Sequence, residues 1–231
     1  MPSIFITGTN RGIGLALVHQ YLAEDWQVYA TARQPESATE LQQLANQYPK
    51  QLSLYALDVT NAIQRQQVAD KLNGIPLDIL INNAGVYGQS DAYFGNTDEE
   101  KWLDALRINT IAPMKIMELL AENIALGEKK IIASMSSKMG SMDDNGSGGS
   151  YVYRSTKAAL NAIMVSAARD LKEAGISAVI LHPGWVRTDM GGANGEINTQ
   201  QSAHRLRAIL DSVSLENSGD FYDIDGSIIP W

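Results

Sequence analysis

The sequence predicts an α/β fold, a doubly wound parallel sheet of about seven strands with helices on both faces. Apolar runs of strand length alternate with longer segments of helical period from the first residue onward. The strand-length runs are continuously apolar, as strands buried on both faces require. The chain has 231 residues, which is enough for a sizeable core, and residues 1–231 are expected to form a single domain.

The elements can be placed in order along the chain. The first strand is expected at Ser3–Thr7, where an apolar run leads into a glycine-rich turn, and the first helix at Gly12–Glu24. The other strands are expected at Gln27–Ala32, Leu52–Leu57, Ile79–Asn82, Lys130–Ser134 and Ile176–His182, with a weaker one at Phe221–Ile224. The other helices are expected at Ser37–Gln47, Ala62–Leu72, Glu99–Ala125, Tyr151–Ala174 and Thr199–Leu210.

The composition excludes several classes of function. The chain has no Cys, so thiol catalysis, thiolate metal sites and disulfides are absent, and its three histidines are not at ligand spacing. No metal site is therefore expected. A net charge of −8 without a basic stripe argues against nucleic acid and anionic membranes as partners. No signal or membrane-spanning segment is recognisable, so a cytoplasmic protein is expected.

The turn after the first strand, Thr7 to Gly14, favours a phosphate site. Gly8 permits a tight turn, Gly12 lets the backbone approach a pyrophosphate, and Gly14 permits close packing of helix and sheet. The N-terminus of the following helix presents free N–H groups to an anion. A glycine-rich turn that binds nothing is the alternative, and the strand before it and the helix after it favour the dinucleotide site.

The end of the second strand indicates which dinucleotide binds. An NAD-binding protein normally carries Asp or Glu at the position that faces the adenosine ribose, and none is present here. Arg33 and Arg11 instead suggest contacts to a 2′-phosphate, each worth roughly 1.5–3 kcal/mol. NADP(H) is therefore the expected cofactor, with two solvated surface charges as the alternative.

Tyr153 and Lys157 are four residues apart and share one face of an expected helix. A phenol that exchanges its proton near neutral pH needs its pKa lowered by about three, which is roughly 4 kcal/mol. A neighbouring ammonium in a partly dry cleft can supply much of this. The alternative is an accidental pair on a helix surface.

Several motifs follow one another along nearly the whole chain. They are the turn at Thr7–Gly14, Asn82-Asn83-Ala84-Gly85, Ser136-Ser137, Tyr153 with Lys157, and Pro183-Gly184-Trp185-Val186-Arg187-Thr188. In this order they resemble the short-chain dehydrogenase/reductases, which have a Rossmann-like fold. Three further segments look like the branch of C-factor and sniffer-type carbonyl reductases: Asn10-Arg11-Gly12, Ser137-Lys138-Met139-Gly140-Ser141 and Gly148-Gly149-Ser150-Tyr151-Val152-Tyr153-Arg154.

The resemblance implies a catalytic set. Tyr153 would be the general acid, Lys157 would lower its pKa and hold the nicotinamide ribose, and Ser137 would bind the substrate oxygen. Asn109 would anchor a water beside Lys157. Ser134, Ser136 and Ser141 crowd the same strand end and leave the choice of serine open. Ser137 is preferred because it begins a Ser-x-x-Gly pattern with Gly140.

The resemblance also implies a cofactor site. Asp58 would meet the adenine amine, Asn82 to Gly85 would line the adenosine side, and Thr188 would hold the carboxamide. Each could instead be an ordinary turn, cap or core residue. The full expected set is Gly8, Asn10, Arg11, Gly12, Ile13, Gly14, Arg33, Asp58, Val59, Asn82, Ala84, Gly85, Tyr153, Lys157, Pro183, Gly184, Val186 and Thr188.

The leading hypothesis is an NADPH-dependent oxidoreductase that reduces a small carbonyl compound, an aldehyde, ketone or quinone. The alternatives are a dinucleotide-binding signalling protein of C-factor type, whose catalysis is incidental, and a purely structural subunit. A homo-oligomer, a dimer or possibly a tetramer, is expected because Glu99–Ala125 and Tyr151–Ala174 are unusually apolar for exposed helices. Segment Asp189–Asn198 is expected to be a small mobile lid with Gly191, Gly192 and Gly195 as hinges.

Overall fold

Seven parallel strands form one central sheet in the computed structural model, which describes residues 1–231. The strand order is β3-β2-β1-β4-β5-β6-β7, so the chain builds outward from β1 in one direction and then from β4 in the other. The expected fold class is confirmed. The strands are β1 (Ser3–Ile6), β2 (Gln27–Ala32), β3 (Leu52–Ala56), β4 (Ile79–Asn82), β5 (Ile131–Met135), β6 (Ser177–Leu181) and β7 (Phe221–Tyr222).

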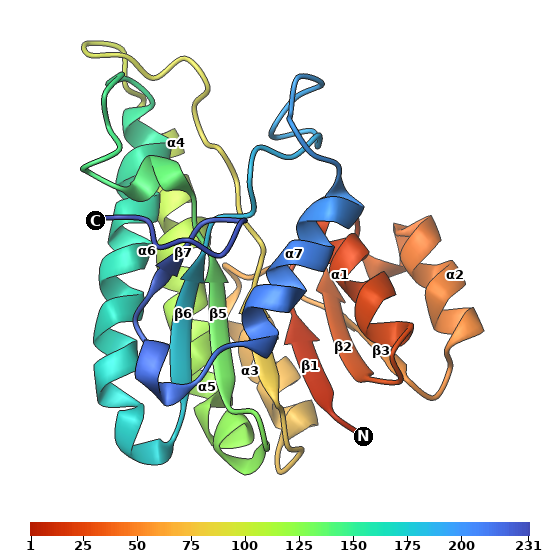
Figure 1. Cartoon of the computed structure of the whole chain (residues 1–231). Helices are drawn as coiled ribbons and strands as arrows, with labels where there is room; N and C mark the ends of the chain where they lie inside the picture. Colours follow the sequence, from red (N-terminus) through yellow and green to blue (C-terminus); the bar gives the residue numbers. More distant parts are fainter.

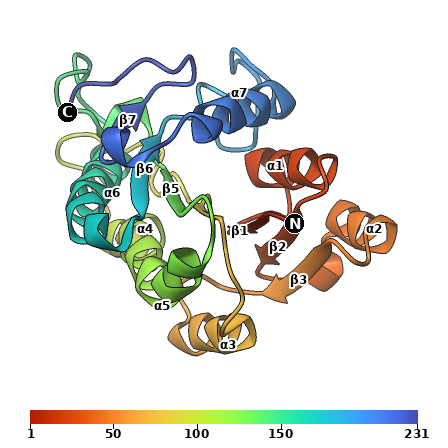
Figure 2. The same ribbon diagram turned by 60° about the horizontal axis from the view of Figure 1, so that its bottom comes forward.

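Helices cover both faces of the sheet, as Figures 1 and 2 show. One face carries α1 (Gly12–Leu22), α2 (Thr39–Gln47) and α7 (Thr199–Asp211). The other face carries α3 (Ala62–Leu72), α4 (Glu99–Leu106), α5 (Ala112–Leu126) and α6 (Tyr151–Asp170). Alternate strand residues point to opposite layers, so that Ile4 and Ile6 join the core under α1 while Phe5 joins the core under α5.

The helix expected over residues 99–125 is interrupted. Between α4 and α5 lies a π-helical turn at Arg107–Ile111, in which the Ala112 N–H donates to the carbonyl of Arg107, five residues back. Pro113 follows directly, and its missing N–H removes a regular α-helical hydrogen bond at this point. Such turns concentrate at functional sites. This one places Asn109 and Thr110 in the interior.

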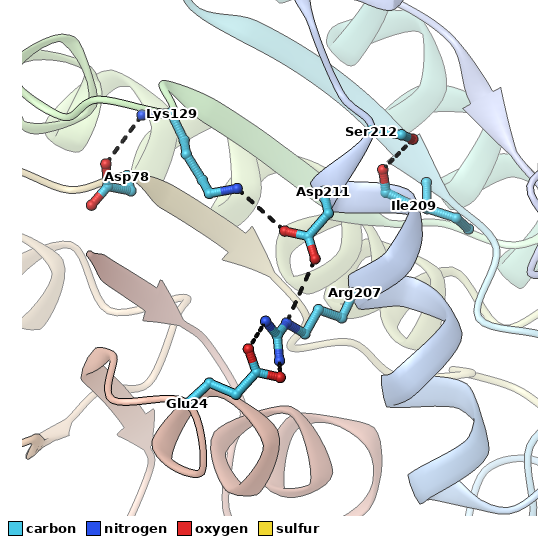
Figure 3. A network of polar contacts seen from close by, with 7 residues as sticks. All are labelled: Glu24, Asp78, Lys129, Arg207, Ile209, Asp211 and Ser212. Carbon is cyan, nitrogen blue, oxygen red and sulfur yellow. Dashed lines mark hydrogen bonds and ion pairs between the residues drawn. The ribbon is translucent and has the colours of Figure 1, made fainter. Parts of the chain in front are cut away.

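A polar network fastens α7 to α1 and to the beginning of β5 (Figure 3). The guanidinium of Arg207 forms an ion pair with Glu24 of the α1–β2 connection and lies 3.8 Å from the Asp211 carboxylate. Lys129 reaches the same carboxylate at 3.2 Å, and its backbone N–H donates to the buried carboxylate of Asp78. The last helix of the chain is thereby tied to the first.

Candidate active site

The carboxyl ends of the strands meet at one edge of the sheet, from which the long loops rise (Figure 1). Every site residue named from the sequence lies at this edge or on an element that begins there. The position agrees with the rule that open α/β sheets bind ligands beyond the carboxyl ends of their strands, near the point where the strand order reverses. Here that point lies between β1 and β4.

Each glycine of the first turn has a different steric role. Gly8 has a φ of +69°, and a Cβ there would lie 2.9 Å from the Cα of Ala84. A Cβ on Gly14 would lie 2.3 Å from the carbonyl oxygen of Gly8, so helix and turn pack closely only without one. Gly12 has a φ of +62° and meets only the Thr188 methyl, at 3.7 Å. The turn therefore has an open backbone face at Gly12.

Helix α1 begins at this open face without a side-chain cap. Its first N–H groups are therefore free to bind an anion such as a pyrophosphate. Asn10 is exposed beside them and Ile13 is half-buried. These features fit a dinucleotide.

The exit of β4 is pinned to the glycine turn by Asn83. Its Nδ2 donates to the carbonyls of Thr7 and Gly8 at 2.8 and 2.9 Å, and the Thr7 hydroxyl accepts from the N–H groups of Asn83 and Ala84. Asn82 is buried and donates to Ser134. The two turns that would flank a cofactor are therefore one hydrogen-bonded unit.

Gly85 lies between this unit and two polar side chains, those of Asn109 and Lys157. A Cβ there would lie 3.2 Å from Oδ1 of Asn109 and 3.6 Å from Nζ of Lys157. Asn109 accepts from the Val86 N–H at 2.9 Å and donates to the Val86 carbonyl at 2.8 Å. The π-helical turn thus places Asn109 beside Lys157, where the resemblance put it.

Tyr153 and Lys157 are both buried on α6, with 8% and 4% of their surface exposed. Nζ of Lys157 donates to the Met135 carbonyl at 2.7 Å and lies 5.7 Å from the centre of the Tyr153 ring. Burial lowers the pKa of Lys157 to about 8. Burial also raises the pKa of Tyr153 to about 12, an effect that a hydrogen bond from Ser137 opposes.

The direction of the Tyr153 shift differs from the sequence expectation. The ammonium of Lys157 lies over the ring and is bonded to a backbone carbonyl, so loss of hydration dominates the pKa of the phenol. A pKa of about 12 leaves the phenol protonated at neutral pH. The group is therefore an acid in this state.

Contacts at the end of β5 separate the crowded serines. Ser137 lies against the phenol of Tyr153, and its Oγ accepts from the Met139 N–H at 3.2 Å. The others are bonded elsewhere, Ser134 to Asn82, Ser136 to Asn161 and Ser141 to the Asp144 N–H. Ser137 alone among them is placed beside Tyr153.

The two expected arginines do not act as a pair in this structure. Arg11 forms an ion pair with Asp189, both side chains being exposed, whereas Arg33 is exposed at the end of β2, near enough to Asp58 to help lower the pKa of that carboxyl. The joint contact of Arg11 and Arg33 to a 2′-phosphate therefore stays a prediction, and Asp189 is the carboxylate that Arg11 meets in this structure. Asp58 accepts from the N–H and hydroxyl of Thr60 at 2.9 and 2.7 Å, which lowers its pKa. Val59 is buried next to it.

Several hydrogen bonds join the two ends of the loop after β6, which contains the expected lid. The Arg187 N–H donates to the Ile197 carbonyl at 2.9 Å, and the Glu196 N–H donates to the Trp185 carbonyl at 2.7 Å. The Trp185 indole, half exposed, donates to the Gly191 carbonyl at 2.7 Å. Pro183, Gly184 and Thr188 are half-buried in this loop and Val186 is buried.

Two of the three expected hinge glycines have a packing role. A Cβ on Gly191 would lie 2.1 Å from the Val186 carbonyl oxygen, and one on Gly195 would lie 2.5 Å from the Arg187 nitrogen. Of the three, only Gly192 has a positive φ and would place a Cβ in open space. The sequence pattern suggested hinge freedom, whereas the structure uses Gly191 and Gly195 for close approach of two backbone segments.

Sequence reasoning missed two contributors to the site. Tyr87 stacks on Tyr153, with ring centres 4.5 Å apart. Thr156 accepts from Asn109 and donates to the Tyr153 carbonyl, linking the π-helical turn to α6. The sequence could have pointed to Thr156, because this residue lies between Tyr153 and Lys157. For Tyr87 the only sequence feature of this kind is its position two residues after Gly85.

The parallel sheet, its switch point and the glycine-rich first turn define a Rossmann-like α/β protein. None of its helices has the length and apolar character needed to cross a membrane, and no three His, Cys, Asp or Glu side chains cluster as metal ligands would. Residues 2–199 match the family model for short chain dehydrogenase, and the chain belongs to this family of oxidoreductases.

Individual relatives agree with this assignment. The chain is 38% identical to the C-signal protein of Myxococcus xanthus over 156 residues, 68% of this chain and 93% of that one. The carbonyl reductase Sniffer of D. melanogaster has a similar structure, with a TM-score of 0.94 and 30% identity over the whole of both chains. An NADPH-bound carbonyl reductase from chicken fatty liver has a TM-score of 0.91 and 32% identity, over 100% of this chain and 99% of that one.

Proposed function

We propose that the protein is an NADPH-dependent carbonyl reductase that converts an aldehyde, ketone or quinone to the alcohol. The observation that carries the proposal is the buried pair of Tyr153 and Lys157, with Ser137 against the phenol. Related structures with bound NADPH or NADP, among them carbonyl reductases, support the choice of cofactor. Arg33, with no carboxylate at the end of β2, supports the phosphorylated form.

The cofactor would be held by the glycine turn and the N-terminus of α1, by Asp58 and Val59, by Asn82 to Gly85, and by the loop from Pro183 to Thr188. Lys157 would bind the ribose hydroxyls, for which the bare backbone at Gly85 leaves access. The chemistry that the cofactor supplies there is delivery of a hydride to a carbonyl carbon.

The chain's own residues supply the proton and the orientation. Tyr153 holds its proton at neutral pH and would donate it to the substrate oxygen as charge develops there. Ser137 would donate a hydrogen bond to the same oxygen and so orient the carbonyl. The charged Lys157 would stabilise the phenolate that remains, and Asn109 would fix the backbone beside it.

A screen of purified protein tests the proposal. NADPH is mixed with the protein and a panel of aldehydes, ketones and quinones, and its absorbance is followed. At least one compound is expected to be reduced, with turnover lost in the Tyr153→Phe variant. A protein that neither binds NADPH nor oxidises it with any compound would refute the proposal.

The similarity to the C-signal protein favours a second candidate, a dinucleotide-binding signalling role in which catalysis is incidental. Complementation separates the two. A Tyr153→Phe variant that still binds NADPH and retains the biological phenotype supports the signalling role. Loss of the phenotype with retained binding supports the enzyme.

A further inference from the structure

A second tyrosine lies flat against the proposed catalytic phenol. The rings of Tyr87 and Tyr153 have their centres 4.5 Å apart and their planes 17° from parallel. Tyr87 is half-buried in the loop after β4, whereas Tyr153 lies on α6. The Tyr87 ring therefore covers one face of the Tyr153 ring and excludes water from that face.

The hydroxyl of Tyr87 is fixed at its far end. It is hydrogen-bonded to Ser150 at 3.0 Å and lies 4.0 Å from the sulfur of Met139. Ser150 ends the loop that precedes α6, and Met139 follows Ser137. Tyr87 thus bridges the loops after β4 and β5 across the face of Tyr153.

Ser150 has an unusual conformation that points to this contact. It is the third successive residue with a positive φ, +49°, after Gly148 at +65° and Gly149 at +64°. A side chain in this region costs roughly 1–2 kcal/mol, which glycine avoids. A serine at a helix N-cap usually bonds the second or third N–H of its helix, but Ser150 makes no such bond. Its hydroxyl is bonded to Tyr87 instead.

We propose that Tyr87, held by Ser150, is a positioning residue for Tyr153. Its ring fixes the plane of the phenol and keeps one face dry, so that the hydroxyl stays directed at Ser137. The proposal rests on the carbonyl reductase function for Tyr153. The burial that raises the pKa of Tyr153 agrees with a ring face kept dry by the stacked Tyr87.

Two substitutions at position 87 test the idea. Tyr87→Ala removes the stacked ring and is expected to lower kcat by about tenfold or more while the Kd for NADPH changes less than about twofold. Tyr87→Phe keeps the ring and loses only the Ser150 bond, so it should lower kcat less than Tyr87→Ala does and about as much as Ser150→Ala. Tyr93→Ala is a matched control from the same loop, because the Tyr93 side chain is 63% exposed. Equal kcat in Tyr87→Ala and Tyr93→Ala would overturn the proposal.

Substitutions at position 150 separate strain from positioning. Ser150→Gly relieves the left-handed conformation, so it should raise Tm while lowering kcat. Ser150→Ala keeps the strain and loses the hydroxyl, so it should lower kcat without raising Tm. A Ser150→Gly protein with unchanged kcat would show that the serine does not act through Tyr87.

A readout without substrate keeps the proposal distinct from the function on which it rests. The ionisation of Tyr153 is followed by tyrosinate absorbance, as the difference between a protein and its Tyr153→Phe partner. Ionisation is expected to begin at lower pH in the Tyr87→Ala background, because the phenol becomes hydrated. An unchanged onset contradicts the positioning role, even if no carbonyl compound is reduced. A changed onset in a protein that reduces nothing supports the role and refutes only the proposed reaction.

Discussion

Tyr153 and Lys157 lose hydration together, and the loss moves their pKa values in opposite directions. The phenol rises to about 12 and the ammonium falls to about 8, because each charged form is the one that water stabilised. At neutral pH, which lies below both values, the phenol keeps its proton and the ammonium keeps most of its charge. Those are the two states that proton donation to a carbonyl needs.

Substitutions of Tyr153 and of Lys157 should affect kcat and NADPH affinity differently. Tyr153→Phe is expected to lower kcat by at least about tenfold with nearly unchanged NADPH affinity, since the phenol acts in the transition state. Lys157→Ala should damage both quantities, because the ammonium would hold the cofactor as well as support the phenol. Steady-state kinetics and NADPH fluorescence titration measure them. A Tyr153→Phe protein with more than about a tenth of normal kcat would refute the role of the phenol as general acid.

The pKa of Lys157 predicts opposite pH trends for activity and stability. Carbonyl reduction should decline as pH rises through about 8, because the ammonium is lost there. Stability should instead rise between about 8 and the ordinary value of 10.5, because the unfolded chain binds more protons in this window. Relative to Lys157→Met, the gain should be roughly 3 kcal/mol. Urea unfolding of both proteins at several pH values measures this gain in the free energy of unfolding. If the free energies of the two proteins change with pH in the same way, the lowered pKa of Lys157 is contradicted.

Arg33 should determine the preference between cofactors. It is the cation at the end of β2, while Arg11 meets Asp189. The unaltered protein is therefore expected to have a higher kcat/KM with NADPH than with NADH, and Arg33→Asp should reverse or abolish the preference. Arg11→Gln is the comparison and should have the smaller effect. Equal kcat/KM for both cofactors in the unaltered protein would contradict the prediction.

At the scale of elements, the turn from Ser137 to Gly140 is pressed against α6. A Cβ on Gly140 would lie 2.9 Å from the carbonyl carbon and Cβ of Lys157. Gly140→Ala is therefore expected to displace the turn or the helix, with a loss of roughly 1–3 kcal/mol in stability and a larger loss in kcat. Gly146→Ala is the matched control, because a Cβ there meets nothing within 4 Å. Thermal unfolding and turnover of both variants check the difference.

The strands were predictable because burial on both faces leaves a continuous apolar run, and Gln27–Ala32 and Ile79–Asn82 have the bounds that the sequence indicated. The π-helical turn was not predictable from periodicity, since one extra residue in a turn hardly disturbs an apolar pattern over residues 99–125. Tyr87 was missed for a different reason. Its role depends on a contact between a loop and a helix, residues 87 and 153, which are 66 positions apart and share no local motif.

At the scale of the molecule, the outer surface of α5 and α6 is where a subunit contact is expected. Met114 and Ile163 are half-buried beside a shallow hollow that Ala162, Ser166 and Ala167 also line. A two-fold dimer through these helices is expected, and Ile163→Glu should yield monomers. Ile63→Glu, at a site 70% exposed on α3, should leave the assembly unchanged. Light scattering at micromolar concentration measures both, and a monomeric unaltered protein would contradict the expectation.

The contact between α1 and α7 affects how the chain folds during synthesis. Glu24 and Arg207 are 183 positions apart, and Leu206 and Leu210 share one core with Leu15 and Leu22. The first helix to leave the ribosome is therefore covered by the last helix to emerge. Until then the part of α1 that α7 covers stays exposed, and transiently exposed apolar surface of this kind favours aggregation. Truncation before residue 199 should leave a chain that depends on chaperones to stay in solution.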